Sequence, residues 1–95
     1  MLDDAFEWDD TKAATNWRKH AVTFEMARDV FDDFFSVEGG DGGYHDGEHR
    51  MLTIGMAENR LLVVCHTTRN GRIRIISVRS AEPNERRKYH NANQT

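Results

Sequence analysis

Arginine side chains are concentrated in segments of this sequence that are predicted to form β-strands. Arg74 and Arg79 lie in one such segment, 72–80, and Arg50 begins an earlier one, 50–57. The planar guanidinium group presents a rigid fork of donors that matches phosphate oxygens. A sheet that carries several arginines therefore suggests a polyanionic partner, with RNA as the first candidate. Beside Arg74 and Arg79, the residues predicted to bind RNA phosphates are Arg50, Arg72, Arg86 and Lys12.

Alternation along the strand decides how Arg74 and Arg79 can be used. Side chains two residues apart share a face of a sheet, so these two arginines are predicted to point to opposite faces unless a bulge intervenes. An unbroken strand would place only one of them near a given phosphate. In the alternative interpretation, either arginine pairs with an acid such as Glu85 and only anchors the last helix.

Three further residues are candidates for catalysis beside Arg74 and Arg79. His66 is the best acid–base candidate, because the ordinary histidine pKa of about 6.5 suits both roles, although a largely apolar strand is equally typical of a buried structural histidine. Lys19 is a candidate to reach a phosphate, although cations near the C-terminus of a helix are also favoured for purely structural reasons. Tyr89 could stack on a base or donate a proton, or simply pack against the core.

The region 36–49 contains acidic and histidine residues that need separate consideration. The residue types suit zinc or manganese, but their spacing fits no compact metal template. A solvated glycine-rich loop is the preferred interpretation, and no metal or other cofactor is expected. The residues concerned are Asp41, His45, Asp46, Glu48 and His49. No phosphate-binding loop, dinucleotide-binding fingerprint or hydrolase nucleophile motif occurs in the sequence.

The charge of the chain is divided between its two halves. Residues 1–48 contain 13 acidic and four basic residues, whereas residues 49–95 contain nine basic and three acidic residues. The overall net charge of −3 therefore hides a strongly dipolar molecule. The length of 95 residues predicts a single domain, 1–95. The single Cys65 excludes an internal disulfide framework, and a reducing cytoplasm is the expected location.

The order of elements predicts an α+β fold. Residues 6–8 are expected to form a short strand or an extended lead-in, followed by a helix from Asp9 or Asp10 to about His20. The predicted apolar stripe of this helix includes Trp17, and its polar stripe includes Asn16. Thr23 is expected to cap a second helix, whose core-facing residues are Phe24, Ala27, Phe31, Phe34 and Phe35.

The second half is predicted to be an antiparallel meander of three to four strands followed by a helix. Strands are expected at about 50–57, 60–68 and 72–80, with a possible ragged strand at 35–38. Asn70-Gly71 is a strong hairpin signal and Glu58-Asn59 a weaker one. Pro83 suits the first turn of a last helix over about 82–90, and residues 91–95 are expected to fray.

Two blocks of the sequence resemble the BrnT toxins of bacterial type II toxin–antitoxin systems. The first comprises Phe6-Glu7-Trp8-Asp9, Lys12, Asn16, Lys19-His20, Val22, Phe24-Glu25 and Ala27. The second comprises the run from Ile73 to Arg79, Ala81, Glu85-Arg86 and Tyr89. Between the blocks, Asp41, His45, Glu48 and Arg50 precede Ile54-Gly55. The resemblance extends from about residue 5 to residue 90, and the chain departs from the pattern in its extra glycines at 39–43 and in Asp46, where the family usually has serine.

The resemblance implies a RelE-like fold and an RNA-cleaving activity that inhibits translation. It also implies a neutralising BrnA antitoxin, whose ribbon-helix-helix part binds operator DNA, so that the toxin meets DNA only indirectly. Two other classes remain open on the residues alone. One is a non-catalytic nucleic-acid-binding module that uses a basic sheet face, and the other is a protein-interaction module whose acidic and basic halves dock head to tail.

Overall fold

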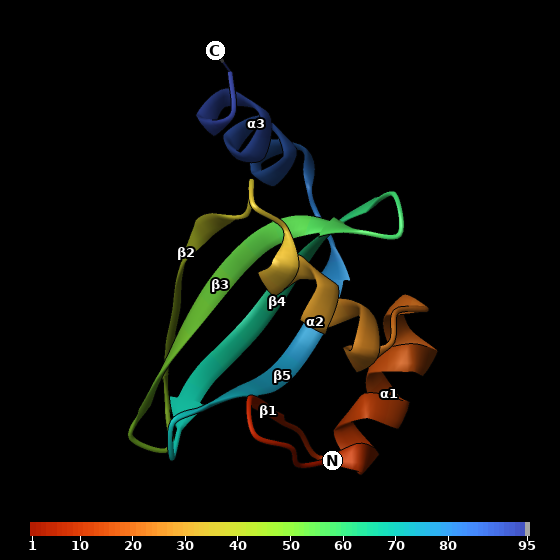
Figure 1. The fold of residues 1–95 in the computed structure, drawn as a ribbon, viewed down its shortest axis with the longest axis vertical. Helices are drawn as coiled ribbons and strands as arrows, with labels where there is room; N and C mark the ends of the chain where they lie inside the picture. Colours follow the sequence, from red (N-terminus) through yellow and green to blue (C-terminus); the bar gives the residue numbers. More distant parts are fainter. Residues whose placement is uncertain (95) are drawn as a thin grey trace.

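The computed structural model describes residues 1–94 and has three helices and one five-stranded mixed sheet (Figure 1). The α+β class and the helices expected from the sequence are confirmed. The elements in chain order are β1 (Phe6–Glu7), α1 (Asp10–His20), α2 (Phe24–Asp32), β2 (Val37–His45), β3 (Glu48–Ala57), β4 (Arg60–Arg69), β5 (Arg72–Ser80) and α3 (Pro83–Ala92).

The sheet has the order β1-β5-β4-β3-β2, and it differs from the prediction in two respects. Strands β2 to β5 are antiparallel neighbours, but β1 pairs in parallel with β5, so a purely antiparallel sheet was wrong. The region predicted as a loop forms β2, which pairs with β3 through two irregularities near Gly40 and Gly43. Both glycines have positive φ angles, which lets the strand absorb extra residues and still pair.

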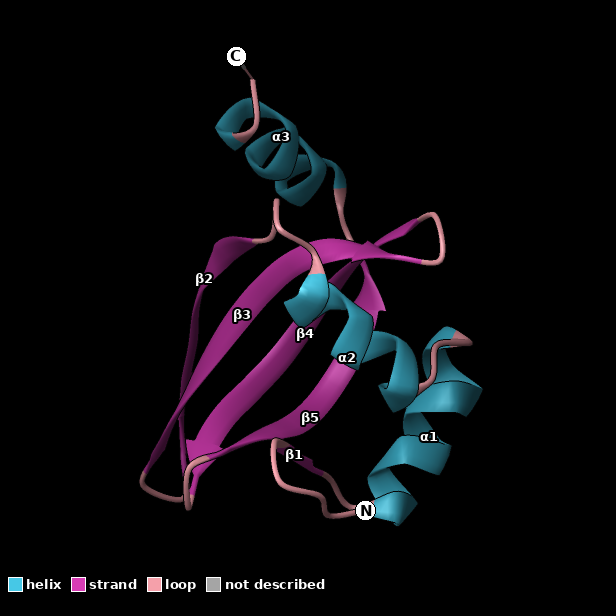
Figure 2. Cartoon of the chain, in the orientation of Figure 1, coloured by secondary structure: helices cyan, strands magenta, loops and turns pink. Residues whose placement is uncertain are grey.

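Two-residue turns with positive φ at both positions join the antiparallel strands. The predicted turns at Glu58-Asn59 and Asn70-Gly71 are confirmed, and Asp46-Gly47 forms a third between β2 and β3. Such turns match the right-handed twist of the strands that they connect. They place the β2–β3 and β4–β5 turns at the same end of the sheet, opposite α3 (Figure 2).

Each helix begins at a recognisable cap. Asp9 accepts hydrogen bonds from the amides of Thr11 and Lys12 at the start of α1, and Thr23 accepts one from Met26 at the start of α2. The predicted last helix is longer than expected, since α3 continues to Ala92. Thr95, the last residue predicted to fray, lies outside the described residues.

Hydrophobic side chains form a separate core on each face of the sheet. One core lies under α2 and beside α1, on the near face in Figure 1, and includes Phe24, Leu62, Val64, Ile75 and Val78. The other lies under α3 and consists of Ile54, Leu61, Val63, Ala81 and Tyr89. We call these sheet faces the α2 face and the α3 face. Because α3 covers only one end of its face, the other end is left open.

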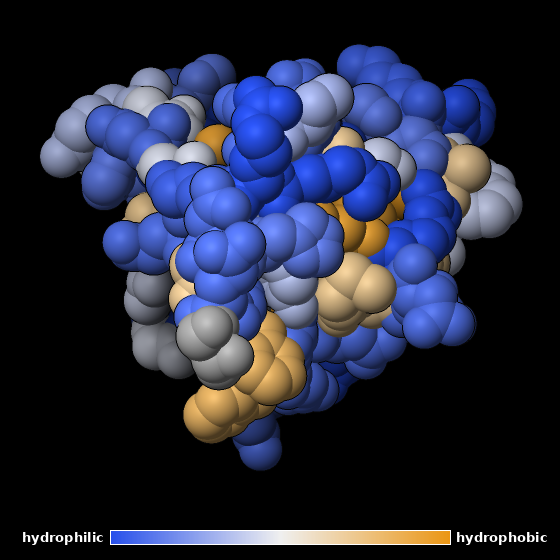
Figure 3. Space-filling model, turned by 90° about the horizontal axis from the view of Figure 1, so that it is seen from above, coloured by the Kyte–Doolittle hydropathy of each residue, from blue (hydrophilic) through white to orange (hydrophobic). Residues whose placement is uncertain are grey.

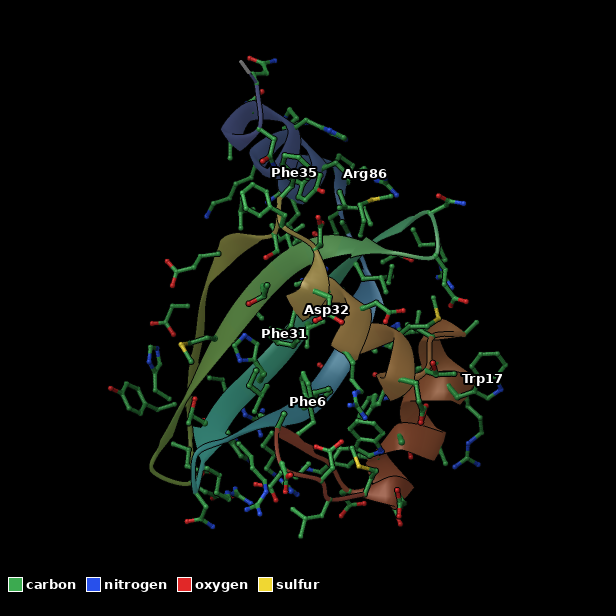
Figure 4. All side chains as sticks on the ribbon, in the orientation of Figure 1. Phe6, Trp17, Phe31, Asp32, Phe35 and Arg86 are labelled. Atoms are coloured by element: carbon green, nitrogen blue, oxygen red, sulfur yellow. The ribbon has the colours of Figure 1, made fainter. Side chains whose placement is uncertain are left out.

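Three aromatic residues predicted for the core are exposed instead. Trp17 is 54% exposed and points away from the body of the molecule (Figure 4). Phe34 and Phe35 are 92% and 53% exposed, because α2 ends at Asp32 and the helical periodicity does not reach them. Seen from the α3 end, the surface is mainly hydrophilic with a few apolar patches (Figure 3).

Asn16 is buried on α1, although the sequence predicted it for the polar stripe of this helix. Its side-chain amide donates to the carbonyl oxygens of Val22 and Val78 and accepts from the amide of Val78. These bonds satisfy the outer edge of β5 beyond the short β1, which would otherwise expose unpaired backbone groups. Asn16 therefore fixes α1 against β5. Among the described helices, none combines the length and apolar composition that a membrane span requires.

Candidate nucleic-acid interface

A bulge in β5 places Arg74 and Arg79 on the same face of the sheet. Arg74 is paired with Thr67 and Arg79 with Val63, and these partners are four residues apart in β4. The register shifts opposite Cys65 and His66, where Ile76 is the extra residue of β5. The prediction that the two arginines point to opposite faces was therefore wrong, because it assumed an unbroken alternation. Both belong to the α3 face.

Three arginines from neighbouring strands converge at the open end of this face. Arg50 of β3, Arg69 of β4 and Arg74 of β5 line one open cavity with a volume of about 350 Å³. Lys12 of α1 contributes a fourth cation. We call this cavity the arginine pocket; its remaining lining residues are His45, Asp46, Glu48 and Ile76.

The cations of the arginine pocket differ in how far they are already paired. The Nε atom of Arg69 donates to Glu48 at 3.0 Å and a second nitrogen contacts the same carboxylate, which lowers the pKa of Glu48. Arg74 lies 3.4 Å from Glu7, whose second carboxylate oxygen is buried without a partner. Within the described residues, Arg50 and Lys12 form no ion pair. These two groups are therefore the most available to an anionic ligand.

Arg79 lies at the other end of the same face and is held by α3. Its two terminal nitrogens donate to the two carboxylate oxygens of Glu85 at 2.7 and 2.9 Å. This contact raises the pKa of Arg79 and lowers that of Glu85. About five residues of strand separate Arg79 from Arg74, or roughly 15 Å. Because Glu85 holds it there, Arg79 does not line the arginine pocket with Arg74.

His66 lies on the opposite, α2 face and is not brought to the arginines. Its Nε2 atom is 2.8 Å from the Thr53 hydroxyl, and its ring packs edge-on against Phe31 with centroids 4.9 Å apart. Burial lowers the pKa of His66, because the charged form would lose its hydration. The sequence left open whether His66 is catalytic or structural, and its neutral, buried ring favours the structural interpretation.

Tyr89 and Arg86 lie on α3, where Figure 4 shows Arg86, and neither residue lines the arginine pocket. The Tyr89 hydroxyl donates to Asp33 at 2.7 Å, and the same carboxylate accepts from the amides of Phe35 and Met56. Burial and the contact with Asp33 raise the pKa of Tyr89 to about 12. Through its hydrogen bond to Asp33, the Tyr89 hydroxyl links α3 to the end of α2. Arg86 is exposed.

The remaining predicted residues are divided between two places. Arg72 donates from Nε to the carbonyl oxygen of Asp3 at 2.7 Å, which holds the N-terminal segment and leaves Arg72 outside the arginine pocket. Lys19 lies with His20 along α1, where both line a neighbouring cavity that also includes Lys12. The structure therefore brings Lys12, Arg50 and Arg74 together, and separates them from His66, Tyr89 and Arg86.

His45 and Glu48 are members of the pocket that the sequence did not single out for catalysis. They were interpreted as part of a solvated loop, whereas they flank the turn between β2 and β3 and so reach the pocket. The dipeptide Asp46-Gly47 is a hairpin signal that would have revealed this placement. His49, by contrast, lies 2.8 Å from Asp41. Among residues 1–94, no three potential metal-ligating side chains come together.

The fold and the pocket define a small α+β domain with a cationic cavity at the open end of one sheet face. The family described as the ribonuclease toxin BrnT of type II toxin–antitoxin systems matches residues 8–85. The chain therefore belongs to the BrnT toxin family, as the resemblance implied. No curated protein matches the chain closely enough to serve as a relative.

Proposed function

We propose that the chain is an endoribonuclease whose reaction takes place in the arginine pocket. The observation that carries this proposal is the convergence of Arg50, Arg69 and Arg74 from three adjacent strands, joined by Lys12 from α1. Cations fixed around an open cavity suit the negative charge that accumulates on a phosphodiester during cleavage. The description of the family as ribonuclease toxins supports the same reaction.

The proposed reaction needs no metal ion. A base removes the proton of the 2′-hydroxyl group, the resulting oxygen forms a bond to phosphorus, and the bond from phosphorus to the 5′-oxygen breaks. An acid then protonates the leaving oxygen. The products are a 2′,3′-cyclic phosphate and a free 5′-hydroxyl end. We assign Arg50, Arg74 and Lys12 to the non-bridging phosphate oxygens, where their charge replaces that of a metal ion.

We assign the proton transfer to His45. Histidine is the side chain whose ordinary pKa lies closest to neutrality, and His45 is the histidine that lines the arginine pocket. Glu48 stays ionised because Arg69 lowers its pKa, so it orients Arg69 and is a poor acid. The Nε2 atom of His45 lies 3.6 Å from Asp46, and both side chains are exposed, so His45 can turn toward either the 2′-oxygen or the leaving 5′-oxygen.

The other predicted residues have supporting roles in this proposal. Arg79 and Arg86 contact RNA beyond the pocket, with Arg79 held in place by Glu85. Arg72 acts through the N-terminal segment that it anchors. His66 and Tyr89 have structural roles, since the Nε2 atom of His66 and the hydroxyl of Tyr89 form hydrogen bonds inside the fold.

A toxin of a type II system has an antitoxin partner, and we propose its identity and its mode of action. The partner is a BrnA antitoxin that covers the arginine pocket with an acidic or helical segment, and its ribbon-helix-helix part binds the operator. The free toxin, with a RelE-like fold and a cytoplasmic location, cleaves messenger RNA and so inhibits translation. The split charge of the chain supports an acidic segment as the inhibitor of the basic face.

The test is cleavage by the purified free chain, on free RNA in excess EDTA and on RNA engaged by translating ribosomes in their magnesium-containing buffer. We expect cleavage of at least one substrate, products that end in a 2′,3′-cyclic phosphate, and no cleavage where a 2′-deoxynucleotide replaces the attacking residue. Intact RNA in both cases, with salt-sensitive binding, would instead indicate a module that only binds phosphates. Cleavage of free RNA that EDTA abolishes would contradict the metal-independent chemistry.

A further inference from the structure

A second cavity lies beside the arginine pocket, between α1 and β5. It has a volume of about 230 Å³, and we call it the helix pocket. Residues from successive turns of α1 form one wall, and the bulged part of β5 forms the other. Its lining residues are Thr11, Lys12, Thr15, Asn16, Lys19, His20, Ile76 and Ser77.

The chemical character of the helix pocket favours an anion. Lys12 and Lys19 supply two positive charges, and Thr11 and Ser77 supply hydroxyl groups that can donate hydrogen bonds. No acidic residue lines this cavity, whereas Asp46 and Glu48 line the arginine pocket. Asn16 is already satisfied by Val22 and Val78, so its role is to fix the wall.

The acidic residues at the start of α1 form no ion pair with the lysines, although the backbone amide and the charge of Lys12 both contribute to the lowered pKa of Asp9. Asp9 uses its carboxylate to accept from the amides of Thr11 and Lys12, and Asp10 contacts the N-terminal amino group at 3.3 Å. Within the described residues, neither Lys12 nor Lys19 forms an ion pair. The positive charge of the helix pocket is therefore available to a ligand.

The helix pocket and the arginine pocket are adjacent. Both are lined by Lys12 and by Ile76, the residue that the β5 bulge inserts. A ligand that enters one cavity therefore reaches the other across a single lysine and one apolar side chain. Regularly spaced phosphates along a flexible strand match two adjacent cationic cavities better than one isolated anion does.

The position of Lys19 at a helix end does not by itself explain the cavity. Cations are favoured in the last turn of any helix by its partial negative charge, and Arg18 occupies that same turn without lining the helix pocket. Arg18 and Lys19 therefore share the helix-end effect and differ in access to the cavity, which makes them a matched pair for experiment.

We propose that the helix pocket binds a phosphate of the RNA strand next to the one that is cleaved, with Lys19 as the main contact and Lys12 between the two subsites. This inference rests on the proposed function, because the arginine pocket is taken to hold the scissile phosphate. It makes Lys19 a substrate-binding residue that sets the path of the strand, in place of the catalytic role predicted from the sequence.

The experiment measures binding of a short 2′-O-methyl RNA oligonucleotide, which lacks the attacking hydroxyl and stays intact. Affinity is measured over a range of salt concentrations for wild type, Lys19→Ala, Arg18→Ala and Arg50→Ala. Loss of one phosphate contact makes the negative slope of log affinity against log salt shallower by about 0.7 for a single strand. We expect this change for Lys19→Ala and for Arg50→Ala, and the wild-type slope for Arg18→Ala.

A second measurement places the contact on the strand. One phosphate at a time is replaced by a neutral methylphosphonate, and affinity is compared between wild type and Lys19→Ala. We expect one replacement to weaken RNA binding by the wild type several-fold and to have no effect on binding by Lys19→Ala. Replacement of the neighbouring phosphate should weaken binding by the wild type and have no effect on binding by Arg50→Ala. Such non-additivity is the mark of a direct contact.

The outcomes separate this inference from the proposed function. If Arg50→Ala changes the slope and Lys19→Ala does not, the helix pocket does not bind RNA phosphate. Its cations would then be available to bind an acidic protein partner. If Arg18→Ala weakens binding as much as Lys19→Ala, the effect is only one of general charge. If neither Arg50→Ala nor Lys19→Ala changes the slope, the arginine pocket fails as well.

Discussion

The two faces of the sheet use the same strands for opposite purposes. On the α2 face, Leu62, Val64 and Ile75 are buried, and the ionisable His66 is kept neutral by that burial. On the α3 face, the alternate positions of the same strands carry Arg50 and Arg74 to an open cavity. The comparison teaches that the buried core and the proposed ligand-binding residues are separated by strand alternation, so a substitution on one face should leave the other unaffected.

The bulge at Ile76 is what keeps this separation intact in β5. Without the extra residue, Arg74 and Arg79 would lie on opposite faces, and one of the two charges would be forced toward the α2 core. Burying an unpaired charge in such a core is costly. The bulge instead places both arginines on the α3 face and adds Ile76 to the wall between the two pockets.

The largest expected effect is on stability, from the substitution Leu62→Ala on the α2 face. Leu62 is fully buried, so its loss leaves a cavity and should lower the free energy of unfolding by about 3 kcal/mol. Leu2→Ala is the matched control, because Leu2 is 64% exposed and should change stability by less than about 0.5 kcal/mol. Urea denaturation measures both, and equal effects would contradict the assignment of the core.

On the open face, His45→Ala should act on activity and not on stability. Loss of a general acid or base typically reduces the rate about 100-fold or more, whereas an exposed turn residue contributes little to folding. His90→Ala on α3 is the control, since His90 is also exposed but lies outside the arginine pocket. Cleavage rates of the folded variants provide the test, and an unchanged rate for His45→Ala would remove His45 from the mechanism.

The buried histidine of the α2 face should make stability depend on pH. Since burial lowers the pKa of His66, the unfolded chain binds a proton that the folded chain resists. The stabilising contribution is therefore complete above the ordinary pKa of about 6.5 and is lost as pH falls toward the lowered value. The slope from this group is at most about 1.4 kcal/mol per pH unit.

This dependence can be assigned to His66 by comparing urea denaturation at neutral pH and near pH 5. Replacement by glutamine, His66→Gln, should remove part of the decrease between the two conditions, whereas His90→Ala should preserve it. If His66→Gln and wild type lose stability in parallel, the decrease comes from other groups and the account of this face is wrong.

The smallest effect is expected from Phe34→Ser. Phe34 is 92% exposed and packs only edge-on against Phe35, with ring centroids 5.4 Å apart. A surface substitution of this kind should change the free energy of unfolding by no more than about 0.5 kcal/mol. A loss comparable to that of Leu62→Ala would mean that Phe34 is part of a core.

The sequence predicted the elements of the fold better than their packing. Caps, hairpin turns and alternating strands are local signals, so Asp9, Thr23 and Asn70-Gly71 marked boundaries that the structure has. The short β1 joins β5 through a pairing distant in sequence, which no local pattern encodes. Strand β2 was anticipated only as a possible ragged strand at 35–38 before a loop, because its glycines weaken strand propensity, even though it closes with the turn at Asp46-Gly47.

The candidate site was only partly predictable for the same reason. Residue type alone predicted Arg50, Arg74 and Lys12 as candidate phosphate contacts, and the structure brings them together in one cavity. The faces of His66 and Arg79 depended on strand register and on one bulge, which the sequence did not specify. Trp17 was predicted to be buried and Asn16 to be exposed, and the structure has the reverse. Asn16 is buried because its side chain forms hydrogen bonds with backbone groups at the unpaired edge of β5.

The most direct test of the central claim compares one arginine from each face. Arg50→Ala removes an unpaired cation from the arginine pocket, and Arg28→Ala removes a cation on the α2 face that pairs with Asp3 and stacks over Phe6. RNA cleavage is measured for both variants under conditions in which each is folded. We expect Arg50→Ala to lose about 100-fold in rate and Arg28→Ala to retain the wild-type rate. Equal rates for the two variants would contradict the assignment of RNA cleavage to the open face.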